Sequence, residues 1–172
     1  MERIILGAFS KPVYGFLSFI NERHPKDEKS KRGKILECGA GGSIPPLALF
    51  AQHGYEAWGI DISDEQLNLA RQFCEQHGIR MQLRTGDMRQ IPFEDETFDY
   101  VYEHYSLCHL SKKDTAQSLR EMYRVLKHQG LCFLGVMSVE CWPESRFGHE
   151  ERSRGVLGRR RRRRKFTQPV QR

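Results

Sequence analysis

Residues 35–43 read Ile35-Leu36-Glu37-Cys38-Gly39-Ala40-Gly41-Gly42-Ser43. The apolar half predicts a short buried strand, and the glycines predict a tight turn, because glycine lacks a Cβ and accepts positive φ. Ile44-Pro45-Pro46-Leu47 then predicts a helix, with Ser43 as its cap and proline tolerated in its first turn. Strand, glycine turn and helix in this order are typical of nucleotide pockets in doubly wound folds. The alternative is an ordinary tight turn.

Outside this stretch, strand-like and helix-like segments alternate along the chain. Such alternation predicts a parallel sheet with right-handed crossovers and helices on both faces. We therefore expect an α/β fold, a doubly wound, mostly parallel, Rossmann-like sheet of about five strands. The expected strands are 34–38, 56–61, 80–84, 98–102 and 131–136, and the expected helices are 44–53, a segment between the cap Ser63 and Gly78, and one between Ser111 and Gly130.

Apolar spacing predicts which side of each helix faces the sheet. Those residues are Ile44, Leu47, Ala48 and Ala51 in the first helix, Leu67, Ala70 and Cys74 in the second, and Ala116, Leu119, Met122 and Leu126 in the third. A further helix near the N-terminus is predicted by Phe9, Val13, Phe16, Leu17 and Ile20, with Pro12 at its start or kink. That helix either packs on the sheet or covers a ligand, with Tyr14 facing the pocket.

The chain divides into three parts. Residues 1–33 form an N-terminal helical cap and a charged linker, 34–140 the Rossmann-like domain, and 141–172 an irregular basic tail that we expect to be disordered. The net charge of +6 is uneven, because residues 149–172 carry +8 and residues 1–148 carry −2. The basicity therefore says nothing about what the domain binds.

Composition excludes several classes of protein. No apolar run approaches the length of a membrane span, and the start lacks the features of a signal peptide. The five cysteines form no C-x-x-C pair, so we expect reduced thiols, mostly in the core, a cytoplasmic location and no metal site.

The glycine turn also separates two classes of nucleotide site. The dinucleotide fingerprint G-x-G-x-x-G fails because residue 44 is isoleucine, which disfavours an NAD-type oxidoreductase. Glu37, two residues before Gly39, instead resembles the first motif of class I S-adenosylmethionine (SAM) methyltransferases. That family often has a third glycine where this chain has Ser43, with Gly42 as a substitute.

Further motifs extend this resemblance to about residues 33–137. They are Gly59-Ile60-Asp61-Ile62-Ser63, Ile91-Pro92-Phe93, Phe98-Asp99-Tyr100-Val101 and the segment 121–131, and together they are similar to a methyltransferase type 11-like domain. The family usually continues with a helix and two more strands. Because residues 141–172 lack strand periodicity, we expect the C-terminal strands to be missing, through truncation or an altered reading frame.

The resemblance implies SAM as cofactor and a set of residues that bind it. Asp61 lies 20 residues beyond Gly41, the spacing of a carboxylate that accepts from ribose hydroxyls; its alternative role is a helix cap. Asp87 would accept from the adenine amine and Met88 would contact the ring, the alternative being a surface turn. The implied cofactor-binding residues are Tyr14, Glu37, Gly39, Ala40, Gly41, Asp61, Ile62, Gly86, Asp87, Met88 and Glu103.

The sequence indicates the acceptor site less clearly than the cofactor site. His104 and His109 follow the fourth expected strand and are candidate catalytic bases, because histidine titrates near neutrality. The alternative is a surface or cofactor-contacting role. No Asn-Pro-Pro-Tyr motif is present, which disfavours DNA adenine and protein glutamine as acceptors.

We therefore predict a SAM-dependent methyltransferase with an unidentified, small-molecule acceptor. The alternative is a SAM-binding module of weak or no activity, tethered to nucleic acid or acidic partners by Arg159–Arg164.

Overall fold

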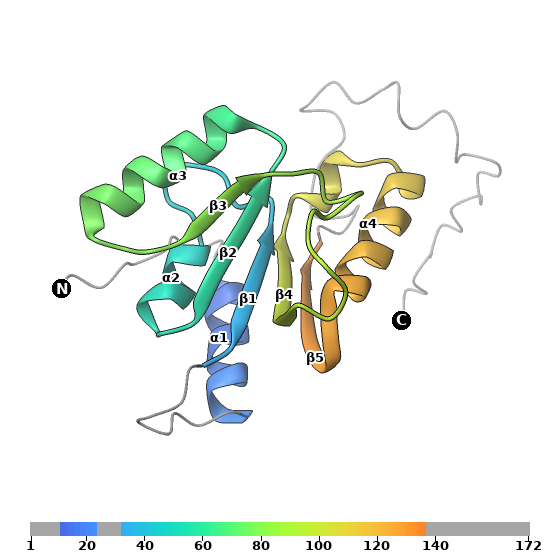
Figure 1. Cartoon of the computed structure of the whole chain (residues 1–172), viewed down its shortest axis with the longest axis horizontal. Coiled ribbons are helices and arrows are strands. Elements are labelled where there is room, and N and C mark those ends of the chain that lie inside the picture. The colour runs from blue at the N-terminus through green and yellow to red at the C-terminus, as the bar shows by residue number, and fades with distance from the viewer. Residues whose placement is uncertain (1–10, 24–31, 137–172) are drawn as a thin grey trace, which may run out of the picture. The chain divides into compact units, whose positions relative to one another are not determined.

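The computed structural model describes residues 11–23 and 32–136 as one unit built on a five-stranded sheet (Figure 1). All four strand pairings are parallel, and the strand order is β3-β2-β1-β4-β5. The elements are α1 (Lys11–Arg23), β1 (Lys34–Cys38), α2 (Leu47–Gln52), β2 (Glu56–Asp61), α3 (Asp64–His77), β3 (Gln82–Thr85), β4 (Phe98–His104), the 3-10 helix η2 (Leu107–His109), α4 (Lys112–Val125) and β5 (Leu126–Gly135). The predicted doubly wound α/β fold is confirmed.

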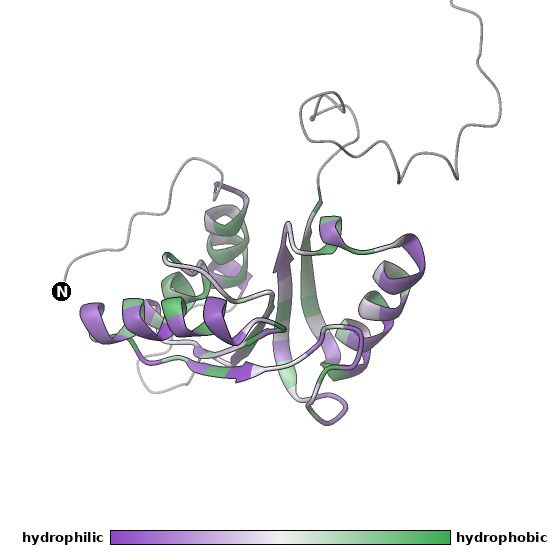
Figure 2. Cartoon of the chain, turned by 90° about the horizontal axis from the view of Figure 1, so that it is seen from above, coloured by the Kyte–Doolittle hydropathy of each residue, from purple (hydrophilic) through white to green (hydrophobic). Residues whose placement is uncertain are grey.

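Two apolar layers cover the sheet, one on each face. One contains Val13, Phe16 and Ile20 of α1 with Leu47 and Phe50 of α2. The other contains Met122 and Val125 of α4, packed on alternate residues of the same strands. Figure 2 accordingly shows α4 across the sheet from α1, α2 and α3. The layers follow from period-two alternation, which sends neighbouring side chains of a strand to opposite faces.

Because every strand pair is parallel, the carboxyl ends of β1, β2, β3 and β4 lie at one edge of the sheet. In open sheets this edge carries the ligand, next to the point where the strand order reverses. Here the reversal lies between β1 and its neighbour β4, so the glycine turn after β1 stands beside the end of β4.

Helix α3 follows its sequence signals closely. The Ser63 hydroxyl accepts from the Gln66 N–H at 3.3 Å, and Gly78 ends the helix in the left-handed conformation, with φ of 63°. Leu67, Ala70 and Cys74 are buried on its inner side, as predicted, and Phe73 joins them.

The start of α2 differs from the prediction. The helix begins at Leu47 rather than Ile44, and its N-cap is Pro46, not Ser43. Ile44 is 58 % exposed instead of facing the core. Two consecutive prolines delay the start of the helix, because proline disfavours helical backbone in the residue before it.

The end of α4 was also predicted wrongly. The helix ends at Val125, and residues 126–135 form β5, so Gly130 does not stop a helix. The buried residues of α4 are Ser118, Met122 and Val125, whereas Leu119 is 36 % exposed. Leu126 pairs with Phe98 of β4, so strand pairing has replaced the last expected helical turn.

The remaining outcomes concern strand ends, cysteines and the tail. β3 starts at Gln82 rather than 80, and β4 extends to His104. Cys38 and Cys74 are buried, whereas Cys108 and Cys132 are exposed, and these four described cysteines are free thiols. Phe9, Cys141 and the predicted basic tail lie outside the described residues. Among the described residues, no helix has the length and apolarity to cross a bilayer.

Candidate cofactor site

A cavity of about 420 Å³ opens at the carboxyl ends of the strands. Three predicted loops meet in it, the glycine turn after β1, the end of β2 and the loop after β3. Its lining residues are Gly39, Ile60, Asp61, Ile62, Gln66, Gly86, Asp87, Met88, Arg89, Ser106, His109 and Leu110. Six of the eleven predicted cofactor-binding residues are in this list, although they come from three separate parts of the chain.

The glycine turn lies pressed against its neighbours. Gly39 has φ of 91°, and an added Cβ would stand 2.0 Å from Ser106 Oγ. Gly41 has ordinary φ, but a Cβ there would stand 2.7 Å from an Asp61 carboxylate oxygen. The N–H groups of Gly39 and Ala40 both donate to the Ile60 carbonyl, at 2.8 and 2.9 Å. The turn therefore needs glycine for backbone conformation at one position and for space at the other.

Asp61 combines the two roles considered for it. Its carboxylate accepts from the Ser63 N–H at 2.9 Å and the Gly41 N–H at 3.1 Å. The first contact orders the entry into α3, and the second ties β2 to the glycine turn. The residue also lines the cavity, so its carboxylate is oriented by backbone donors before any ligand enters.

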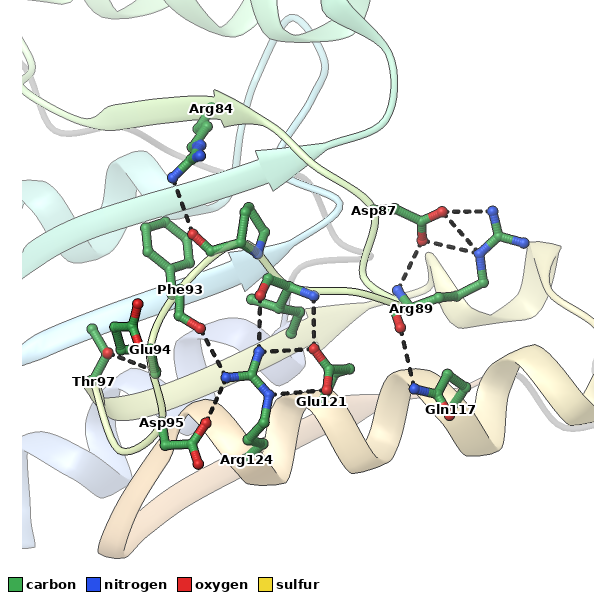
Figure 3. A network of polar contacts seen from close by, with 12 residues as sticks. Arg84, Asp87, Arg89, Phe93, Glu94, Asp95, Thr97, Gln117, Glu121 and Arg124 are labelled. Atoms are coloured by element: carbon green, nitrogen blue, oxygen red, sulfur yellow. Dashed lines mark hydrogen bonds and ion pairs between the residues drawn. The ribbon is translucent and has the colours of Figure 1, made fainter.

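Asp87 forms an ion pair with Arg89, two residues on (Figure 3). The guanidinium contacts both carboxylate oxygens, and this contact, more than any other, lowers the pKa of Asp87. Asp87 is therefore ionised at neutral pH and lies on the cavity wall as a hydrogen-bond acceptor.

The loop after β3 is held to α4 by Arg124 and Glu121 (Figure 3). Arg124 donates to the carbonyls of Phe93 and Ile91 at 2.8 and 2.9 Å and pairs with Glu121 at 2.8 Å. Glu121 in turn accepts from the Ile91 N–H at 2.9 Å. Residues 86–97 contain no helix, so these contacts fix the loop that presents Asp87.

We expect Arg124→Met to lower the free energy of unfolding by about 2 kcal/mol, because the ionised Glu121 loses its partner and two carbonyls lose a charged donor. Urea unfolding measures the change. Arg120→Met is the matched control, because Arg120 is exposed on the same helix and, within the described part of the chain, forms side-chain hydrogen bonds with Gln117 and not with the loop. Equal stability of the two variants would contradict a role for Arg124 in holding the loop.

Two acids are buried where β1 and β4 end. Glu37 is 1 % exposed and accepts from the Leu47 N–H at 3.0 Å, and Glu103 is 0 % exposed and accepts from the Leu107 N–H at 2.8 Å. Burial raises the pKa of Glu37 to about 8 and also raises the pKa of Glu103. The Asp61 and Glu103 carboxylates add to the rise at Glu37. Each acid therefore accepts a hydrogen bond from the first N–H of the helix that follows its strand, α2 for Glu37 and η2 for Glu103.

This burial predicts a pH dependence of stability. Between about pH 4.5 and 8 the folded chain keeps a proton on Glu37 that the unfolded chain releases, so stability falls as pH rises through this window. We expect Glu37→Gln to remove this slope and to be more stable than the unmodified chain by about 4 kcal/mol at pH 8. Thermal unfolding at pH 5 to 8 measures it, with the exposed Glu65→Gln as control. A slope that Glu37→Gln leaves intact would contradict this assignment.

The other predicted residues separate into two groups. His109 lines the cavity, whereas His104 does not and packs its ring 4.2 Å from that of Tyr105. Tyr14, on α1, is partly buried against the core and is not among the lining residues. Glu37, Ala40, Gly41 and Glu103 also lie outside the lining, in the segments that shape it.

Sequence reasoning missed Gln66, Arg89, Ser106 and Leu110. No local sequence pattern marks Ser106, because its place depends on Tyr105, whose φ of 69° is unusual for a residue other than glycine. That conformation turns the chain after β4 so that Ser106 meets Gly39. Among the described residues, no cluster of three or more metal-ligating side chains is found.

Comparisons with known proteins agree with this geometry. The model of the methyltransferase domain family matches residues 36–134. A demethylmenaquinone methyltransferase of Lactiplantibacillus plantarum is 42 % identical over 94 residues, 54 % of this chain and 39 % of that protein. An uncharacterized methyltransferase of Bacillus subtilis is 32 % identical over 98 residues, 56 % of this chain and 38 % of its own. The chain thus matches less than half the length of each of these two relatives.

Solved structures give the same result. A protein of Pyrococcus horikoshii has a TM-score of 0.60 at 26 % identity, covering 75 % of this chain and 58 % of that one. A SAM-dependent methyltransferase of Methanosarcina mazei has a TM-score of 0.57 at 25 % identity, covering 61 % and 52 %. The match of sequence, sheet order and strand-end cavity identifies the family. The chain belongs to the methyltransferase domain family, in its class I, Rossmann-like form.

Proposed function

We propose that the protein binds SAM in the strand-end cavity and transfers its methyl group to a small-molecule acceptor. The observation that carries the proposal is the convergence of Gly39, Asp61 and Asp87 on one cavity. Asp61 would accept from the ribose hydroxyls and Asp87 from the adenine amine, with Met88 against the ring. Ile62 and Gly86 line the same cavity.

The methionine end would lie over the glycine turn, near Glu37 and Glu103. Burial raises the pKa of both carboxyl groups, and a nearby ligand ammonium would stabilise their ionised forms, so this end of the cavity favours a cationic ligand. Loss of the Glu37 proton on binding would make SAM affinity rise with pH up to about 8. Ala40 and Gly41 would contribute backbone to this end, and Tyr14 would cover it from α1.

The cofactor supplies a methyl group on a sulfonium, which leaves by in-line displacement. The chain's own residues would then orient the acceptor and accept its proton. His109 is the better candidate base, because it lines the cavity, whereas His104 does not. Positioning of the two reactants alone accelerates such a transfer, so neither histidine is indispensable to the proposal.

The second candidate is a SAM-binding module with weak or no turnover. It is favoured by the run of six arginines, which lies outside the matched methyltransferase domain. Arg159–Arg164 would then serve as a tether to nucleic acid or acidic partners. With free thiols among its described cysteines, we propose a cytoplasmic location in either case.

The test is calorimetry followed by transfer of label. We expect the full chain to bind SAM and S-adenosylhomocysteine but not NAD, and to move labelled methyl from SAM into a metabolite extract. Binding without transfer, with and without residues 149–172, would favour the module. Binding of NAD in preference to SAM would overturn both candidates.

A further inference from the structure

Asp87 is saturated with hydrogen bonds before any ligand arrives. Its Oδ1 accepts from the Arg89 backbone N–H at 2.8 Å and from Nε at 3.0 Å, and its Oδ2 accepts from Nε at 2.9 Å and Nη2 at 2.5 Å. A carboxylate offers about four lone-pair positions. An incoming donor must therefore displace part of the Arg89 guanidinium.

A second carboxylate lies close enough to pair with that guanidinium. Asp114, in the first turn of α4, lies 3.8 Å from Arg89 Nη1, farther than a hydrogen bond. The Ser111 hydroxyl donates to Asp114 Oδ2 at 2.7 Å, which leaves Oδ1 directed at Arg89. The Arg89 backbone stays fixed, because its carbonyl accepts from Gln117 of α4 (Figure 3). Only the side chain, 41 % exposed, has to move.

We propose that Arg89 gates the adenine end of the cavity. Its guanidinium leaves Asp87 and pairs with Asp114 when the amino group of a 6-aminopurine nucleoside reaches Asp87. This inference rests on the proposed function, and it makes Arg89 a specificity-determining residue, since a purine without the amino group gives no donor to displace it.

The gate also links the two ends of the cavity. Asp114 follows Leu110 by four residues, and Leu110, His109 and Ser106 line the same cavity. Pairing of Arg89 with Asp114 therefore anchors the segment before α4 at the moment when the purine is bound.

Calorimetry on the full chain tests the gate with S-adenosylhomocysteine and its 6-deamino purine analogue. We expect Arg89→Met to bind S-adenosylhomocysteine about two- to fivefold more tightly than the unmodified chain, the range set by one exposed ion pair. The same substitution leaves affinity for the deamino analogue unchanged. Arg120→Met removes an equal charge outside the cavity and changes neither affinity.

Asp114→Asn gives the second arm of the test. Asp114→Asn alone weakens S-adenosylhomocysteine binding about twofold. Added to Arg89→Met it has no effect, because the guanidinium that Asp114 would receive is absent. The gate is overturned, and the proposed function is not, if Arg89→Met binds S-adenosylhomocysteine no more tightly than the unmodified chain. The same conclusion follows if Arg89→Met increases affinity for the deamino analogue by the same factor. Failure of the unmodified chain to bind S-adenosylhomocysteine overturns the proposed function and the gate with it.

Discussion

Asp61→Asn reduces affinity for S-adenosylhomocysteine by about 100-fold or more. Each of two hydrogen bonds from ribose hydroxyls to one carboxylate contributes about 1.5–3 kcal/mol to the free energy of binding. A change of about 1.4 kcal/mol corresponds to a tenfold change in affinity. The asparagine keeps the size of the side chain and one acceptor oxygen for the Ser63 or Gly41 N–H. The loss should therefore appear in binding by calorimetry far more than in thermal stability.

Asp64→Asn is the control for this experiment. Asp64 is an exposed carboxylate three residues away, at the start of α3, and does not line the cavity. It should bind like the unmodified chain. If both substitutions leave affinity unchanged, the ribose does not lie at Asp61. If both weaken it equally, the effect comes from general charge, and the assignment of Asp61 is wrong.

Gly39→Ala should lower the free energy of unfolding by about 3 kcal/mol and abolish binding. The new Cβ would stand 2.0 Å from Ser106 Oγ and 2.7 Å from Ser106 Cβ, at a residue with φ of 91°. A left-handed backbone conformation in a residue other than glycine costs about 1–3 kcal/mol of stability, and an overpacked contact costs a similar amount. Denaturant unfolding and calorimetry measure the two losses.

Two further variants separate these two costs, and a third replaces a glycine where neither cost applies. Ser106→Gly added to Gly39→Ala should recover the part due to the clash. Gly42→Ala, with φ of 107° and open space around it, should show the backbone cost alone. Gly15→Ala within α1, where nothing lies within 4 Å, should stabilise the chain by about 0.5–1 kcal/mol. A stable, ligand-binding Gly39→Ala would contradict the close packing of this turn.

The fold was predictable because its signals are local. The Ser63 side chain begins α3 and the backbone freedom of Gly78 ends it, and short, mostly buried segments form β1 and β2. The end of α4 was not predictable in this way. Gly130 lies within β5, beside an irregularity in its pairing with β4, and a Cβ there would meet the Asp99 carbonyl at 2.9 Å. Pairing of Leu126 and of residues 131–135 with the distant β4 makes this segment a strand.

The site shows the same division. Gly39, Asp61 and Asp87 were predictable because each follows a strand, and parallel strands bring their ends together. Arg89 was not, because its importance depends on Asp114, 25 residues away, as well as on its neighbour Asp87. Ser106 was missed for a similar reason, since the residue that it contacts, Gly39, lies on another strand end.

Hydrogen exchange of the full chain with saturating S-adenosylhomocysteine reports every backbone segment that the ligand covers. We expect slower exchange in three separate peptides, covering residues 37–43, 60–63 and 85–89, at the same ligand concentration. Bound ligand that slows only one of them, or that protects instead the groove formed by residues 123–130 at the other end of α4, would contradict this expectation.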